Sequence, residues 1–359
     1  MQRWTLGEDD VRNQESLAQA AEMLRVGKLV AFPTETVYGL GANALDEAAV
    51  QRIFAAKGRP ADNPLIVHIA DQRQLADLLP AGYEPSHVEK KLMDAFWPGP
   101  LTLLFPVGQQ VAHSVHPGRD TVGIRMPDHP VAQSLIRLCG VPIAAPSANT
   151  SGRPSPTTAA AVEEDLADAL DGLVDGGHCG IGVESTVLLV DDQRAIILRP
   201  GGVTQEMIAN VLDLPVVYDA NVTDANAPAL APGMKYRHYA PNASVHVWWG
   251  DPEDVHRAML ELLIDDEVPS ARPLPKASII APDDFLSRYE FPIARELQRP
   301  LPHETYEDAL AKNLYQLLRE FDHEGATDIL IHGVNPGRGL GTAVMNRLQK
   351  AAEGRVFRV

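Results

Sequence analysis

Short apolar runs alternate with helical patterns along the first 212 residues. Apolar side chains recur at helical spacing in residues 15–26, and Gly27 follows as a helix-ending glycine. Asp46 is typical of an N-cap for a helix through residue 56, and further helices are expected at residues 130–138 and 158–170. Short strands are expected at residues 29–32, 64–69, 101–107, 122–126, 142–145, 186–190 and 195–198. Because several strands follow one another without a helix between them, the pattern predicts an α/β domain with a mixed sheet.

The pattern changes after residue 212. Residues 213–242 have little periodicity and are rich in Ala, Pro, Asn and Asp, which predicts a linker. Strands expected at residues 244–249, 277–280 and 328–332 then alternate with helices at 254–264, 305–321 and 343–352. This regular alternation predicts a small parallel sheet. We therefore expect a first domain at 1–212, a linker at 213–242 and a second domain at 243–359.

Composition and charge narrow the possible functions. The chain has 359 residues, 45% of them apolar, and no apolar run approaches the ~20 residues of a membrane span. No secretory signal is visible, and two cysteines are too few for a disulfide framework, so we expect a cytoplasmic protein. The net charge of −17 argues against a protein that binds nucleic acid through general electrostatic attraction.

Four loop segments are denser in polar and small residues than turns require. They are PTETVYGLG from Pro33, KGRPADNPLIVHI from Lys57, PSANTSGRPSPT from Pro146, and the pair VESTVLL and ILRPGG. Taken alone, each is compatible with a capped turn. Ligands of open sheets bind beside strand ends, so together these loops predict one binding site. Many of the basic residues in the first half lie in such motifs, which favours a small anion as the ligand.

Other signatures are absent or incomplete. There is no phosphate loop of the G-x-x-x-x-G-K-[ST] type and no G-x-S-x-G nucleophile elbow. The segment GRGLGT from Gly337 imitates a dinucleotide loop, but Thr342 stands where a third glycine is needed, so we expect a structural turn, with an anion site at the helix N-terminus as the weaker alternative. His113 and His116 have no third ligand nearby and predict a solvated loop; no protein metal ligand is expected.

The ordered set of motifs resembles the YrdC-like threonylcarbamoyl-AMP synthases in their long, two-domain form. The K-x-R of Lys57 to Arg59 and the S-x-N of Ser147 to Asn149 match that family's signature. PTETVYGL, NPLIVHI, VGIRMP, SANTSG, EST and RPGG match in order, and APGMKYRHYAP and GLGTAVMNRLQKAA match the long form. One departure is Ala231, where a serine is expected before Pro232. The resemblance implies a twisted mixed-sheet YrdC-like domain with a basic cavity, followed by a smaller Rossmann-like domain.

The resemblance also implies a reaction. L-Threonine, bicarbonate and ATP would give L-threonylcarbamoyl-AMP and pyrophosphate, for the threonylcarbamoyladenosine modification of tRNA next to the anticodon. The enzyme would be a nucleotidyltransferase that uses Mg²⁺ with ATP and acts mainly by positioning and charge stabilisation. Separate tRNA threonylcarbamoyl-transfer proteins would consume the product, and little direct tRNA binding is expected at this net charge.

Site residues carried over from the motifs fall into three groups. The catalytic candidates are Lys57 and Arg59. The threonine-binding candidates are Thr36, His68, Arg125, Ala145 and Ser185, with Arg125 pairing the carboxylate and Thr34 as an alternative to Thr36. The ATP-binding candidates are Arg59, Asn63, Thr121, Ser147, Asn149, Ser155, Arg199 and Tyr239. We also expect the linker to fold over the nucleotide as a lid, with Tyr239 or His238 touching ATP.

Three alternative functions remain open from the sequence. A double-stranded RNA-binding module would use a basic concavity, although the net charge disfavours it. A carbamoyl-transfer maturation enzyme would carry a related domain, but its usual zinc-finger cysteines are missing here. A nucleotide-sensing regulator would bind the same ligands without turnover.

Overall fold

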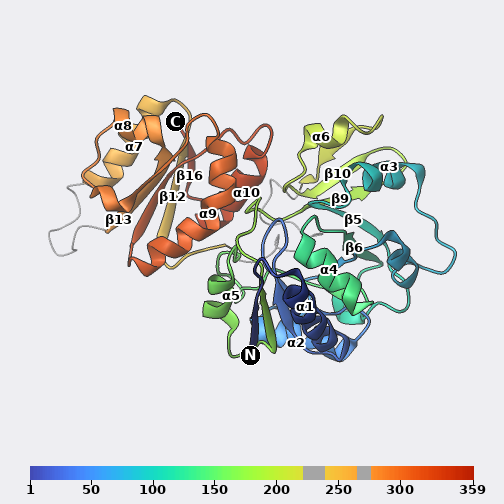
Figure 1. The fold of residues 1–359 in the computed structure, drawn as a ribbon. Helices are drawn as coiled ribbons and strands as arrows, with labels where there is room; N and C mark the ends of the chain where they lie inside the picture. Colours follow the sequence, from blue (N-terminus) through green and yellow to red (C-terminus); the bar gives the residue numbers. More distant parts are fainter. Residues whose placement is uncertain (221–238, 265–275) are drawn as a thin grey trace. The chain divides into compact units, whose positions relative to one another are not determined.

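The computed structural model describes residues 1–220, 239–264 and 276–359, which form two compact units. Among these residues, the first unit holds 1–151 and 155–220. The second unit holds 152–154 together with the described residues from 239 to the end. Figure 1 shows the fold coloured along the chain.

The first unit is built on an 11-stranded mixed sheet in the order β1-β8-β2-β3-β7-β4-β6-β5-β9-β10-β11. Its central strands combine parallel pairs, such as β4 with β6, and antiparallel pairs, such as β5 with β6. The predicted mixed sheet is therefore confirmed. The strands are β1 (Gln2–Thr5), β2 (Val30–Phe32), β3 (Gly39–Asn43), β4 (Ile66–His68), β5 (Leu101–Pro106), β6 (Thr121–Arg125), β7 (Ile143–Ala144), β8 (Gly172–Asp175), β9 (Thr186–Val190), β10 (Ala195–Arg199) and β11 (Val216–Tyr218).

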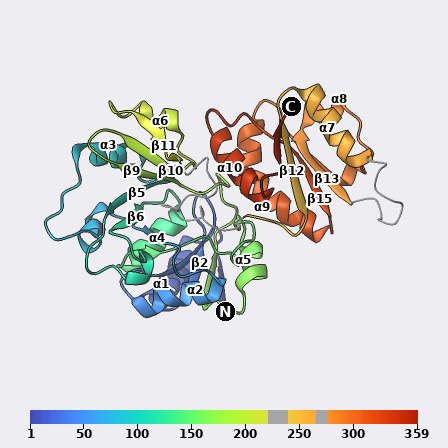
Figure 2. The ribbon, with the colours of Figure 1, turned by 180° about the vertical axis from the view of Figure 1, so that it is seen from behind.

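Helices cover both faces of this sheet. They are α1 (Asp10–Arg25), α2 (Glu47–Lys57), α3 (His87–Phe96), α4 (Pro130–Cys139), α5 (Ala159–Leu166) and α6 (Gln205–Ala209), with short 3₁₀ helices η1 (Gln72–Asp77) and η2 (His113–Val115). Val30 and Phe32 of β2 pack with α1 and α4, which lie side by side in Figure 2, whereas Ala31 packs in the cluster that includes α2, α3 and α5. The alternation of side chains along β2 thus serves two cores.

Capping residues set where the first helices begin. The Asp46 side chain accepts from the amides of Ala48 and Ala49, so the expected N-cap of α2 is confirmed. Helix α1 begins at Asp10, earlier than residue 15, because Asp9 accepts from the amides of residues 11 and 12. Helix α5 ends at Leu166 rather than at the expected residue 170.

The first sheet also extends beyond the expected end of its domain. Strand β11 pairs in parallel with β10 and lies inside the segment that the sequence indicated as linker. Its three residues are too few to show periodicity next to so many Pro, Asn and Asp residues. Within that segment, residues 221–238 lie outside the described residues.

The second unit is a five-stranded sheet in the order β14-β13-β15-β12-β16, and each of its described pairs is parallel. The predicted parallel sheet is confirmed. Its strands are β12 (Ser244–Trp249), β13 (Ala277–Pro282), β14 (Gln298–Leu301), β15 (Asp328–His332) and β16 (Val356–Arg358). Its helices are α7 (Pro252–Ile264), α8 (Asp283–Arg288), α9 (Tyr306–His323) and α10 (Gly341–Ala351), with the 3₁₀ helix η4 (Arg295–Leu297). The pattern missed β14 because it contains Pro300, which an edge strand tolerates.

The glycine-rich loop of the second unit lies between β15 and α10. Its first helical amide, that of Gly341, donates to Glu307 Oε1 at 2.6 Å. A carboxylate of α9 therefore occupies the position where an anion would meet the N-terminus of α10. This contact supports the structural interpretation of the loop. No helix among the described residues is long and apolar enough to cross a membrane.

Candidate functional site

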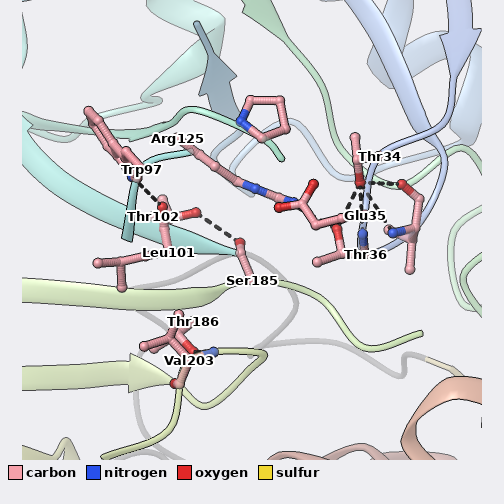
Figure 3. A network of polar contacts seen from close by, with 12 residues as sticks. Thr34, Glu35, Thr36, Trp97, Leu101, Thr102, Arg125, Ser185, Thr186 and Val203 are labelled. Carbon is pink, nitrogen blue, oxygen red and sulfur yellow. Dashed lines mark hydrogen bonds and ion pairs between the residues drawn. The ribbon is translucent and has the colours of Figure 1, made fainter. Parts of the chain in front are cut away.

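The ends of β4 and β6 place His68 and Arg125 side by side. These two residues are register partners on neighbouring parallel strands, and both are buried. The loop after β2 lies against them, where Arg125 Nη1 donates to Thr36 Oγ1 at 3.1 Å (Figure 3). The three expected threonine-side residues Thr36, His68 and Arg125 thus come from loops and strand ends far apart in the sequence.

A chain of hydroxyl groups continues from Thr36. Thr34 Oγ1 donates to the main-chain oxygen of Val37 at 2.7 Å, which uses its only proton. Thr36 Oγ1, 2.9 Å away, must therefore donate to Thr34 and accept from Arg125. Thr36 is thus the threonine that contacts the basic group, whereas Thr34 fixes its orientation. The expectation that Thr36 contacts threonine, with Thr34 as the alternative, stays a prediction.

Glu35 is a site residue for which the sequence indicated no role. Its Oε1 lies 2.6 Å from Arg125 Nη2, and the exposed side-chain fractions are 11% for Glu35 and 4% for Arg125. The approach does not have hydrogen-bond geometry, because neither Glu35 oxygen has a hydrogen-bond partner among the described residues. The sequence feature that could have indicated Glu35 is the position of its carboxylate between two threonines in PTET.

Burial keeps His68 neutral. Loss of solvation, followed by the positive charge of Arg125, lowers the pKa of His68 to about 3. Its Nδ1 atom is buried and has no hydrogen-bond partner in the described part of the chain. A neutral imidazole with one uncommitted nitrogen can bind a hydroxyl or an amine of a ligand.

Ser185 connects two parts of the site. Its hydroxyl lies 2.8 Å from Thr102 Oγ1, a residue of β5 that the sequence analysis did not single out. Arg199, at the end of β10, donates through Nη2 to Ser185 Oγ at 3.1 Å and to the Ser185 main-chain oxygen at 2.9 Å. A side chain expected to bind threonine is therefore held by one expected to bind ATP.

The close approach behind Ser185 depends on glycine. A Cβ at Gly201, in the RPGG segment, would lie 2.3 Å from the Glu184 main-chain oxygen and 2.4 Å from the Ser185 carbonyl carbon. Only glycine allows the chain after β10 to pass so near this loop.

The K-x-R and S-x-N motifs meet at the end of α2. Lys57 Nζ is buried and donates to the main-chain oxygens of Ser147, at 2.5 Å, and Asn149. Lys57 therefore holds the loop at Ser147 and Asn149, two of the expected ATP ligands. Further along this loop Ser155 Oγ donates to Glu184 Oε1 at 2.7 Å, which adds Glu184 to the residues that the sequence did not indicate.

Arg59 and Asn63 form a second group beside β4. Arg59 Nη2 donates to the main-chain oxygen of Pro64 at 2.9 Å. Asn63 is buried, and its Nδ2 has no hydrogen-bond partner within the described ranges. Thr121, the first residue of β6, lines a small cleft together with Pro64 and Thr102.

Two further expected ligands are Ala145 and Tyr239. The amide of Ala145 is already used, since it donates to the main-chain oxygen of Ile66 at 2.9 Å. Tyr239 belongs to the second unit, where its ring stacks on Tyr315 at a centroid distance of 5.2 Å, with the Arg347 guanidinium 5.7 Å from the ring centroid. His238 and the central part of the expected lid lie outside the described residues.

The described residues contain no group of three or more His, Cys, Asp or Glu side chains that could hold a metal ion. The His113 and His116 rings lie 5.6 Å apart in and beside η2. His116 Nδ1 is 2.8 Å from the main-chain oxygen of Arg119, so this ring is engaged in its own turn.

The fold and the strand-end site define a two-domain YrdC-like protein. A family model described as "Telomere recombination", named for Sua5, YciO and YrdC, matches residues 22–201. A second, described as "Threonylcarbamoyl-AMP synthase, C-terminal domain", matches residues 203–353. The chain therefore belongs to the threonylcarbamoyl-AMP synthase family in its two-domain form, and the expected resemblance is confirmed.

Similar proteins cover nearly the whole chain. The threonylcarbamoyl-AMP synthases of Bacillus subtilis and Pyrococcus abyssi are each 47% identical to it, over 96% and 95% of this chain and 95% of each relative. The crystal structure of P. abyssi Sua5 complexed with L-threonine matches with a TM-score of 0.87 and 43% identity, covering 100% of this chain and 99% of that chain. These similarities do not favour the alternative of an RNA-binding module.

Proposed function

We propose that this protein joins L-threonine, bicarbonate and ATP into L-threonylcarbamoyl-AMP and releases pyrophosphate. The contact between Arg199 and Ser185 carries the proposal, because it places an arginine suited to phosphate beside the group of residues suited to an amino acid. Family membership and the threonine named with the Pyrococcus structure support the same assignment.

The residues suit a reaction that needs positioning more than covalent catalysis. The threonine amine would take up bicarbonate with loss of water to give a carbamate, whose oxygen attacks the α-phosphorus as pyrophosphate leaves. Arg125 would hold the carboxylate, Thr36 would fix the Arg125 guanidinium, and Ser185 would hold the amino acid near the nucleotide. Lys57 would keep the S-x-N loop in place, and Arg59 and Arg199 would neutralise charge on the phosphates.

Mg²⁺ would accompany ATP rather than reside in the protein. Phosphate oxygens and water can supply most of its ligands. Near the S-x-N loop, Glu184 already accepts a hydrogen bond from Ser155. The ion would supply charge neutralisation of the departing pyrophosphate.

The product, a reactive mixed anhydride, calls for partner proteins that transfer the threonylcarbamoyl group to tRNA. We propose that these partners hold the tRNA, since a net charge of −17 makes tight binding by this chain unfavourable. A cytoplasmic location fits the two cysteines, Cys139 and Cys179, which are both free and buried.

The decisive experiment measures pyrophosphate release with each substrate omitted in turn. Release should require ATP, threonine and bicarbonate together, and mass spectrometry should identify the adenylate. Serine should be a poorer substrate, by the ~1–3 kcal/mol that one methyl contributes in a pocket. Release that continues unchanged without threonine would refute the assignment, and stoichiometric binding without turnover would indicate a nucleotide sensor instead.

A further inference from the structure

Glu35 lies against Arg125, the residue proposed to bind the substrate carboxylate. Arg125 donates to Thr36 through Nη1, and its Nε and Nη2 atoms are buried and make no hydrogen bond to the described residues. Nε and Nη2 form the side of the guanidinium that binds a carboxylate with two parallel hydrogen bonds. In the structure that side is neutralised by Glu35 at 2.6 Å without such bonds (Figure 3).

A buried ion pair of this kind is unfavourable unless further hydrogen bonds satisfy it. The Glu35 carboxylate satisfies the charge of Arg125 but leaves both of its own oxygens without hydrogen bonds among the described residues. An amino acid in its zwitterionic form brings one carboxylate and one ammonium group. The ligand carboxylate can replace Glu35 as the partner of Arg125, and the ligand ammonium group can replace Arg125 as the partner of Glu35. Both contacts supply the missing hydrogen bonds.

We propose that Glu35 is the ammonium-binding residue of the amino acid site and that it shields Arg125 when no substrate is bound. The substrate carboxylate takes the Nε and Nη2 side of Arg125, and Glu35 turns to the α-ammonium group. Each buried charge keeps an opposite charge in both states. This inference rests on the proposed function, because it assumes that Arg125 binds the substrate carboxylate.

Selectivity follows from the same exchange of partners. A ligand with a carboxylate but no ammonium group would displace Glu35 and leave it buried without a counter-charge, which is strongly unfavourable. A ligand with an amine but no carboxylate would leave Arg125 buried without a counter-charge. The pair therefore selects α-amino acids over the corresponding hydroxy acids.

The test compares L-threonine with 2,3-dihydroxybutanoate, in which a hydroxyl replaces the ammonium group. Affinities are measured by isothermal titration calorimetry on the full chain without ATP. The parent protein should bind threonine at least tenfold more tightly than the hydroxy acid. In Glu35→Gln that ratio should shrink by tenfold or more, with the hydroxy acid bound more tightly than by the parent.

Two variants control this experiment. Glu35→Asp keeps the charge and should keep the ratio within about threefold of the parent. Glu47→Gln removes a carboxylate of α2 that pairs with Ser114 outside the site, and should leave the ratio unchanged. Thermal unfolding of each variant shows whether it is folded at the temperature of the titration.

Other outcomes overturn the inference. If Glu35 has only a structural role, Glu35→Gln should weaken the binding of threonine and of the hydroxy acid equally. If Glu35 only competes with ligands for Arg125, Glu35→Gln should tighten the binding of both equally. A parent that releases pyrophosphate only with threonine but shows an unchanged ratio in Glu35→Gln would refute the role of Glu35 alone. A parent that neither binds threonine nor needs it for release would refute the proposed function and this inference with it.

Discussion

Lys57 Nζ lies 2.5 Å from the main-chain oxygen of Ser147 and donates to the main-chain oxygen of Asn149 as well. The end of α2 and the S-x-N loop are therefore held together by one buried ammonium group. Removing that group would leave two inward-facing carbonyl groups without this donor. The loop would lose its fixed position before any substrate contact is lost.

Lys57→Met keeps an unbranched side chain, one atom shorter, and removes the donors. We expect the free energy of unfolding to fall by ~1–3 kcal/mol, the cost of an unsatisfied buried polar group. We also expect KM for ATP to rise more than KM for threonine. Urea unfolding and pyrophosphate release with each substrate varied would measure this, with the exposed Lys90→Met as control. Equal stability and unchanged KM values would count against the positioning role.

Thr102 orients Ser185 from the neighbouring strand, through a buried contact of 2.8 Å. Thr102→Val keeps the shape and removes this hydroxyl. The lost hydrogen bond is worth about 1 kcal/mol, so KM for threonine should rise roughly fivefold while KM for ATP stays constant. Thr102→Ser should behave like the parent. A rise in KM for ATP alone would show that Ser185 belongs to the nucleotide.

The sequence predicted the strands that form uninterrupted apolar runs better than those that contain glycine. Apolar runs identified β2, β5, β6 and β9. Strands β3 (GLGAN) and β8 (GLVD) were missed because glycine hides the pattern, and their strand conformation depends on pairing with neighbours. Local preference could not reveal that pairing.

The site shows a similar division. Motifs indicated Thr36, Arg125 and Ser185, which the fold does bring to neighbouring strand ends and loops. They did not indicate Glu35 or Thr102, whose importance arises only from the partner across the sheet. A carboxylate opposite a buried arginine becomes visible only when residues 35 and 125 come together in space.

Arg59 is the expected phosphate-binding residue that offers the sharpest kinetic test. Its guanidinium donates to the main-chain oxygens of Asn63 and Pro64. Arg59→Ala should remove ~2–4 kcal/mol of transition-state stabilisation and so lower kcat/KM. Arg59→Lys should also lower kcat/KM, because the planar guanidinium that binds two oxygens at once is lost. Arg52→Ala, at an exposed arginine of α2, serves as the control. An Arg59→Ala rate within twofold of the parent would make Arg59 an ordinary surface arginine.

His68 makes the stability of the first unit depend on pH. Its pKa is about 3 in the folded protein and roughly 6.5 when unfolded, so between these values the unfolded chain binds the extra proton. Stability from keeping His68 neutral is therefore complete well above pH 6.5 and is lost progressively as the pH falls below it. From pH 7 to 5.5 this loss amounts to about 1.2 kcal/mol.

His68→Gln cannot take up that proton. The variant should be less stable than the parent at pH 7, and the difference in free energy of unfolding should shrink by about 1.2 kcal/mol at pH 5.5. Burial also lowers the pKa values of His129 and His332, but both proteins retain these residues, so their contributions cancel in the difference. Urea unfolding at the two pH values measures it. A difference that stays constant with pH would mean that His68 titrates alike in the folded and unfolded chain, and its burial would then not hold it neutral.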